Sequence, residues 1–215
     1  MRACGRWGRA AGLAAALVLA AGARLAAAQT IIDDWAKVEP PPAPALKPAV
    51  VPAKTTALLV MDLLKQSCSA ERRPRCVASI PKVKALIAAA EAKGGTVIWT
   101  VFPGAKREDF LPEVAPPAGA PLLTAPADKF VRTDLEQQLK AKRITTVIAT
   151  GTAAHGAVLY TASEAALRGF KVVVPVDGLS SETLYQEQAA VYLLATAPTI
   201  AGNTTLTSVD RIDYR

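Results

Sequence analysis

The sequence has few of the residues that bind metals. It has one histidine, His155, and three cysteines in 215 residues. A metal centre is usually built from three or four such ligands. The chain also has no match to the GxGxxG and GxxxxGKS/T motifs of phosphate-binding loops. We therefore expect no metal ion and no cofactor.

The N-terminus has the pattern of a secretory signal peptide. Its positive residues are Arg2, Arg6 and Arg9. The apolar stretch 10–22 follows, and small residues at 26–28 precede Gln29 as a cleavage site does. A membrane anchor is the weaker alternative, because the apolar run is short and ends at Arg24. We predict a signal peptide at 1–28 and a periplasmic or secreted protein.

Export changes the charge of the chain. Residues 1–28 hold four of the 25 basic residues and none of the 18 acidic ones, so 21 basic residues and a net charge of +3 remain. No basic stripe remains to suggest nucleic acid. We expect a small-molecule substrate, no nucleic acid, no membrane contact after cleavage, and a homo-oligomer.

Cleavage leaves Cys68 and Cys76, which enclose the polar segment CSAERRPRC. Two nearby cysteines in a loop form a disulfide in an oxidising compartment. In a reducing compartment they would be free thiols. The predicted export favours the disulfide.

Residues 29–53 are predicted to be a linker. The prolines of this segment are Pro40, Pro41, Pro42, Pro44, Pro48 and Pro52. Such a run disfavours regular structure and favours extended backbone. The segment is either a spacer or a strap over the domain that we predict at 54–215.

Within 54–215, apolar strand patterns alternate with helical patterns. Strands are predicted at 55–61, 96–102, 145–150 and 171–176, with a short one at 204–206. Helices are predicted at 80–93, from a cap at Thr133 with Glu136 to about 142, before Gly169, and at 181–195. The alternation predicts an α/β fold, with a parallel sheet covered by helices on both faces.

Two features mark one edge of this sheet. Asp62 directly follows the first strand, where a carboxylate is costly unless it is paired or used; a turn or cap acid is the alternative. Gly151 ends the third strand, and a turn of small residues then places His155 at a helix start. Ligands usually bind at this carboxyl edge.

Three segments resemble the isochorismatase-like, or cysteine hydrolase, superfamily. They are ALLVMD at 57–62, KFVRTDLEQQLKAKRITTVIATG at 129–151 and GTAAHGAVLYTASEAALRGFKVVVPVDGLSS at 151–181. The resemblance implies a three-layer α/β/α sandwich with a mostly parallel sheet. It also implies an Asp, a Lys and a nucleophilic Cys as the working residues, beside a cis peptide that shapes an oxyanion pocket.

Carried over, the Asp is Asp62 and the cis bond is Thr152–Ala153, but the Cys position is Ala157. Lys129 lies closer to the following helix than the family lysine does; it is either that lysine or a surface residue. His155 follows an Ala as in isochorismatases that lack the Cys, and is either catalytic or structural.

A methyl group cannot attack a carbonyl, so the thiol mechanism is excluded at Ala157. The first hypothesis is a hydrolase of a small polar molecule in which Asp62 is the acid/base and water attacks. The alternative is an inactive pseudoenzyme that binds a ligand or a partner. A third possibility is that Cys68 supplies the thiol, which a disulfide to Cys76 would prevent.

Overall fold

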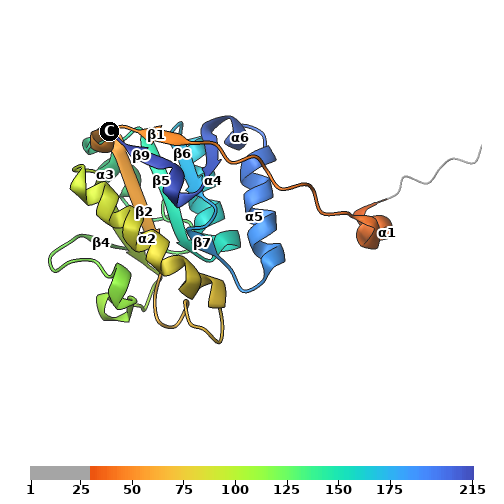
Figure 1. The fold of residues 1–215 in the computed structure, drawn as a ribbon, viewed down its shortest axis with the longest axis horizontal. Coiled ribbons are helices and arrows are strands. Elements are labelled where there is room, and N and C mark those ends of the chain that lie inside the picture. The colour runs from red at the N-terminus through yellow and green to blue at the C-terminus, as the bar shows by residue number, and fades with distance from the viewer. Residues whose placement is uncertain (1–29) are drawn as a thin grey trace, which may run out of the picture. The chain divides into compact units, whose positions relative to one another are not determined.

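The protein is described from a computed structural model (Figure 1), which describes residues 30–215. The predicted signal peptide at 1–28 lies outside these residues. The chain forms two units, the first ending at Pro40 and the second spanning Pro41–Arg215. The described part of the first unit contains the short helix α1 (Ile31–Asp34) and a 3₁₀ turn (Trp35–Lys37).

The second unit is built on a seven-stranded sheet. Its strands are β2 (Thr56–Met61), β3 (Thr96–Val101), β4 (Leu122–Thr124), β5 (Thr146–Thr152), β6 (Lys171–Pro175), β7 (Leu179–Ser180) and β8 (Thr204–Thr207). Its helices are α2 (Pro74–Ala92), α3 (Leu135–Ala141), α4 (Leu159–Leu167), α5 (Leu184–Thr196) and α6 (Ile200–Asn203). The strand order is β4-β3-β2-β5-β6-β8, with β7 paired to β5, and all these pairings are parallel. The predicted α/β fold with a mostly parallel sheet is confirmed.

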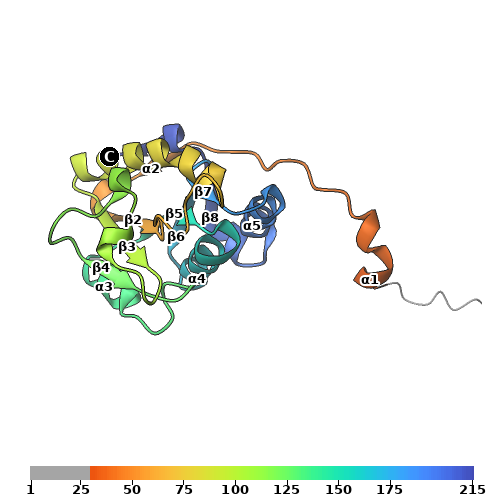
Figure 2. The ribbon, with the colours of Figure 1, turned by 90° about the horizontal axis from the view of Figure 1, so that it is seen from below.

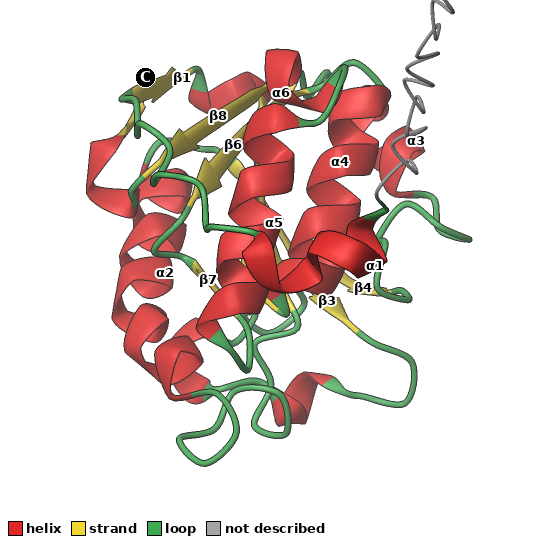
Figure 3. Ribbon diagram, turned by 90° about the vertical axis from the view of Figure 1, so that its right-hand side faces the viewer, coloured by secondary structure: helices red, strands yellow, loops and turns green. Residues whose placement is uncertain are grey.

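The sheet lies between two apolar layers because the side chains of its central strands are buried on both faces. In β2, Leu58 and Val60 join the cluster that contains the buried side chains of α2. Leu59 and Met61 join the cluster that contains those of α3, α4 and α5. Figure 2 shows α2 on one side of the strands and α3 and α4 on the other, and Figure 3 shows α4 and α5 running side by side. Alternate side chains of a strand point to opposite faces, so a fully apolar strand requires both layers.

The segment predicted as a linker contains a strand. Strand β1 (Ala49–Val51) pairs in parallel with β9 (Ile212–Tyr214), near the C-terminus. The prediction that prolines prevent regular structure was wrong here, because Pro48 and Pro52 flank the strand and its own residues keep their N–H groups. From Pro41 onward the segment therefore belongs to the second unit, as a strap.

Three helix starts also differ from the prediction. Helix α5 begins at Leu184 rather than at residue 181, because Thr183 caps it by accepting from the Gln186 N–H. Helix α2 begins at Pro74 rather than at residue 80, because proline is well suited to the first helical position. Helix α3 begins at Leu135 after Asp134, and the Leu135 N–H donates to the Thr133 hydroxyl at 3.3 Å, so Thr133 still caps the helix start. The Thr133 hydroxyl donates to the Lys129 carbonyl at 2.5 Å, and Glu136 pairs with other side chains. Among residues 30–215, no helix has the length and apolar character needed to cross a membrane.

Candidate active site

The site forms where β2 and β5 end side by side. Met61 of β2 is in register with Gly151 of β5. Gly151 has φ +120°, and a Cβ atom built on it would lie 2.0 Å from the Met61 carbonyl oxygen. Only glycine permits this approach. The close pairing brings the end of β2, and therefore Asp62, against the turn that follows β5.

Asp62 is held in an unusual backbone conformation. Its φ is +55°, which few residues other than glycine adopt. The Ser67 hydroxyl donates to the Asp62 carbonyl at 2.5 Å, and the Asp62 N–H donates to the carbonyl of Thr100 at 3.2 Å. Such conformations persist where surrounding contacts enforce them, and they cluster at functional sites.

The Asp62 carboxylate is paired with Lys129. Lys129 Nζ donates to Asp62 Oδ2 at 2.7 Å and to the Pro126 carbonyl at 3.0 Å, while the Thr100 hydroxyl donates to Asp62 Oδ1 at 2.9 Å. The Lys129 side chain is 0% exposed and that of Asp62 is 8% exposed. Lys129 is therefore a buried partner of the carboxylate and not a surface residue.

The backbone of Lys129 is fixed by its neighbours. Its N–H donates to the Thr161 hydroxyl of α4 at 3.1 Å, and its carbonyl accepts from Thr133. These two bonds direct the side chain inward although the residue lies next to α3.

Burial dominates the ionisation of the pair. Burial raises the pKa of Asp62 above its ordinary value of 3.8, and the charge and hydrogen bond of Lys129 partly oppose this shift. Burial likewise lowers the pKa of Lys129 below 10.5, partly opposed by Asp62. Both shifts favour neutral forms, because charged groups lose hydration when buried. A carboxyl group with a raised pKa keeps its proton longer as the pH rises, as a general acid requires.

The turn after β5 leads directly into the central helix. The peptide bond Thr152–Ala153 is cis. A π-helical turn, Ala154–Val158, precedes α4, and such turns occur often at functional sites. Ala157, which the sequence resemblance assigns to the nucleophile position, lines the same cavity as Asp62.

His155 lies apart from this arrangement. Its ring Nδ1 lies 2.9 Å from the Ser181 hydroxyl oxygen, and the Ser181 N–H donates to Glu187 at 2.7 Å. Ser181 is fully buried, and neither residue is among those that line the cavity beside Asp62. The structure thus brings together Asp62, Lys129, Thr152, Ala153 and Ala157, but places His155 in a contact that ties the turn to the β7–α5 segment.

The cavity at this edge has a volume of about 400 Å³. Its lining residues are Asp62, Gln66, Ser67, Arg72, Arg73, Phe102, Ala127, Thr152, Ala153, Gly156 and Ala157. Our sequence analysis missed the polar wall formed by Gln66, Ser67, Arg72 and Arg73. The available signal was their position, since they follow β2 at the carboxyl edge, where ligands usually bind.

Cys68 and Cys76 form a disulfide across the segment that carries both arginines. Both cysteines are buried, and neither lines the cavity. A bridged sulfur has no thiolate to act as a nucleophile. The arrangement therefore argues against Cys68 as a substitute for the missing cysteine.

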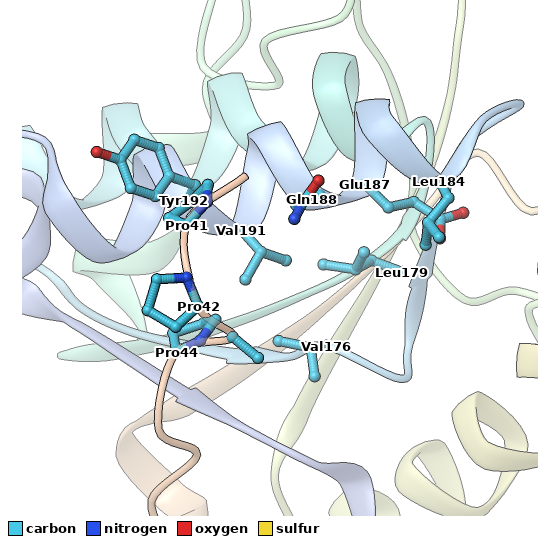
Figure 4. A pocket seen from close by; sticks show the side chains of 11 residues that line it. Pro41, Pro42, Pro44, Val176, Leu179, Leu184, Glu187, Gln188, Val191 and Tyr192 are labelled. Atoms are coloured by element: carbon cyan, nitrogen blue, oxygen red, sulfur yellow. The ribbon is translucent and has the colours of Figure 1, made fainter. Parts of the chain in front are cut away.

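A second cavity, of about 260 Å³, lies between the strap and α5 (Figure 4). Pro42, Pro44 and Val176 face side chains of α5, among them Val191. Glu187 is the one charged residue of its lining, so this cavity has no acid–base pair. Within residues 30–215, no group of three or more His, Cys, Asp and Glu side chains is placed to hold a metal ion.

Fold and site together define a three-layer α/β domain with a buried carboxylate–lysine pair at the carboxyl edge of its sheet. The sequence matches the family model of the isochorismatase domain over residues 56–206. The chain therefore belongs to the isochorismatase family. Among curated proteins, none matches the sequence.

Solved structures of similar fold agree with this assignment. An isochorismatase-like hydrolase from Alkaliphilus metalliredigens has a TM-score of 0.65 and 24% identity, covering 74% of this chain and 96% of its own. A cysteine hydrolase from Pseudomonas syringae has a TM-score of 0.65 and 17% identity, with coverages of 79% and 95%. N-carbamoylsarcosine amidase from Thermoplasma acidophilum has a TM-score of 0.62 and 20% identity, with coverages of 73% and 97%. At these identities the likeness concerns the fold.

Proposed function

We propose that the protein hydrolyses a small polar molecule without a covalent intermediate. The observation that carries this proposal is the buried Asp62–Lys129 pair, with Nζ and Oδ2 at 2.7 Å. Its Asp62 lines the same cavity as Ala157, the position that the family resemblance assigns to the nucleophile. The site therefore has an acidic side chain but no nucleophilic side chain at Ala157. Water is the remaining nucleophile for such a site.

In the proposed reaction, protonated Asp62 donates its proton to the leaving atom of the bond that breaks. A water molecule adds to the electron-poor atom left behind, and its surplus proton returns to the Asp62 carboxylate. One water is consumed, the broken bond is replaced by a bond from the leaving atom to hydrogen (O–H or N–H) and one C–O bond, and the enzyme is regenerated. A positioned acid/base of this kind typically contributes a factor of about 10²–10⁴ in rate.

The neighbours of Asp62 have distinct roles in this scheme. Lys129 Nζ stabilises the carboxylate after its proton has left, and the Pro126 carbonyl holds that ammonium group in place. Thr100 fixes the second carboxylate oxygen. The Thr152–Ala153 backbone borders the cavity, where its polar groups can stabilise developing charge.

The test is to incubate the protein with a panel of small enol ethers, esters, amides and ureas and to detect the hydrolysis products by mass spectrometry. With a substrate found this way, Asp62→Asn should lower kcat at least a hundredfold, while Asp213→Asn, an exposed carboxylate on β9, should leave it unchanged. The wild-type rate should fall as the pH rises through the pKa of Asp62, which lies above 3.8 because of burial. Activity that survives Asp62→Asn would remove Asp62 from the mechanism.

A pseudoenzyme remains the competing function. It predicts ligand binding with no turnover of any panel member by the wild-type protein. The retained acid–lysine pair favours catalysis, since a buried charged pair is costly to maintain. Turnover by the wild-type protein that is lost in the Asp62→Asn variant would exclude the binding-only function.

We further propose that the protein is exported to the periplasm or secreted, with cleavage before Gln29. The bridged Cys68–Cys76 pair supports an oxidising compartment. N-terminal sequencing of the mature protein tests this: a start at Gln29 is expected, and an intact Met1 in the cell's soluble fraction would refute it.

A further inference from the structure

The cavity beside Asp62 has more positive than negative charge in its wall. Its charged lining residues are Asp62, Arg72 and Arg73. Asp62 is matched by Lys129 at 2.7 Å. Both arginines share one acid, Glu182, whose Oε1 lies 2.8 Å from Arg72 Nε and 3.3 Å from Arg73 Nη2. One positive charge in this group therefore has no counter-charge.

Arg73 is buried and not fully hydrogen-bonded. The residue is 8% exposed. Its Nη1 donates to the Ser67 carbonyl at 2.9 Å and to the Thr152 hydroxyl at 3.3 Å, but its Nε has no partner. Buried donors are normally satisfied, and an unsatisfied donor on a charged group is especially costly. This nitrogen has almost no exposed surface, so it senses the charge around the guanidinium group rather than contacting a ligand directly.

Arg72 and Arg73 are fixed in place by several constraints. They lie inside the segment closed by the Cys68–Cys76 disulfide, directly before α2. Arg73 contacts Thr152, the first residue of the cis peptide bond, so this wall adjoins the turn that borders Ala157. The ion pairs with Glu182 attach the same segment to the β7–α5 connection.

We propose that Arg72 and Arg73 bind a carboxylate group of the substrate, which is a small monoanion. This inference rests on the proposed function, because it names the substrate class of the same site. A guanidinium group presents planar paired donors that match the two oxygens of a carboxylate. The single uncompensated positive charge matches a single negative charge. Bound there, the carboxylate directs the rest of the molecule toward Asp62 across the cavity.

The first experiment measures binding without turnover. Benzoate and benzamide have nearly the same shape, but only benzoate is charged at neutral pH. Titration of the full chain followed by ¹⁵N–¹H NMR should show benzoate binding at least tenfold more tightly than benzamide. It should also shift the Nε–H resonance of Arg73. Equal affinity for both probes, or benzoate binding that leaves this resonance unmoved, would overturn the proposal.

The second experiment uses charge variants. Arg72→Gln and Arg73→Lys should each weaken benzoate binding at least tenfold. Arg75→Gln is the matched control, because Arg75 is also an ion-paired arginine of this region, bound to Glu187, but does not line the cavity. If Arg75→Gln weakens binding as much as Arg72→Gln, the effect is general charge and the proposal fails. Should Arg73→Lys not fold, the Arg72 variant and the wild-type resonance still decide the result.

Asp62→Asn separates this inference from the proposed function. The variant should bind benzoate at least as tightly as the wild type, since it removes a negative charge from the cavity, while losing turnover. If neutral and anionic substrates are hydrolysed equally well, and both depend on Asp62, only the carboxylate inference fails. If benzoate binds as expected but no substrate is turned over, only the hydrolase proposal fails.

Discussion

Removing the Lys129 ammonium group while keeping its buried chain tests the energetics of the site most directly. Lys129→Met retains an unbranched side chain of similar length in a fully buried position. It deletes the charge 2.7 Å from Asp62 Oδ2. Two of the three interactions that hold down the pKa of Asp62 come from Lys129, and Thr100 supplies the third. In the variant, burial acts on Asp62 almost unopposed.

The size of the effect has an upper limit set by proton binding. A buried, unpaired Asp62 can become neutral by binding a proton. For a carboxyl group of ordinary pKa near 3.9, this protonation costs about 4 kcal/mol at pH 7 and about 1.5 kcal/mol at pH 5. Breaking a buried ion pair by removing one partner typically costs about 3–5 kcal/mol. We therefore expect a loss of about 3–4 kcal/mol at pH 7 and of about 1–2 kcal/mol at pH 5.

The direction in which the stability of the variant changes with pH follows from proton linkage. In the variant, native Asp62 binds its proton over a pH range in which the unfolded chain has already released it. The native state then holds more protons, so the free energy of unfolding falls as the pH rises, by about 1.4 kcal/mol per pH unit. Below the ordinary pKa of 3.8 the penalty vanishes.

Urea unfolding followed by circular dichroism at pH 5, 6 and 7 measures this loss. Lys171→Met, at an exposed lysine, is the control and should change stability by less than about 0.5 kcal/mol. The double variant Asp62→Asn with Lys129→Met should recover most of the loss, because no charge remains buried. A loss that is constant with pH, or a double variant as unstable as the single one, would refute the electrostatic reasoning and assign the effect to packing.

Two further predictions concern the frame of the site. Gly151→Ala should destabilise the fold by about 3 kcal/mol or more, because it adds overpacking to a positive φ, whereas Gly169→Ala, also at positive φ but in open space, should cost about 1–2 kcal/mol. Urea midpoints compare them, and equal losses would show that contact with Met61 is unimportant. Replacing Cys68 and Cys76 by alanine should lower stability by about 2.5 kcal/mol for a loop of this length. It should also weaken benzoate binding; unchanged affinity would mean that the disulfide does not position the arginines.

Much of the fold was determined by local sequence pattern. Fully apolar strands such as β2 can only be buried on both faces, and their alternation with helices leads to a parallel sheet. Asp62 follows β2 directly, so its place at the carboxyl edge needed no tertiary information. The absence of a thiol at Ala157 was equally plain, because the segment 151–181 follows the family pattern closely.

Other local signals were misleading where a neighbour competed for the same group. The Thr133 hydroxyl accepts from the Leu135 N–H as a helix cap does, but Glu136 pairs with Arg168, 32 residues away, rather than completing a capping box. The proline-rich strap was expected to lack regular structure, yet it forms β1 because β9 supplies hydrogen-bond partners. In both cases the partner comes from a distant part of the chain, so local helix and strand propensities could not predict it.

The chemistry of the site was decided by tertiary structure. Lys129 is 67 residues from Asp62 in sequence, and only the packing of α4 and the Pro126 carbonyl turn its side chain inward. Arg73 reaches Thr152 across 79 residues. By itself the sequence determined an isochorismatase-family scaffold with an acid and no thiol. Only the folded chain decided which lysine pairs with that acid and which arginines line the cavity, because pairing energies depend on distance and burial rather than on position along the chain.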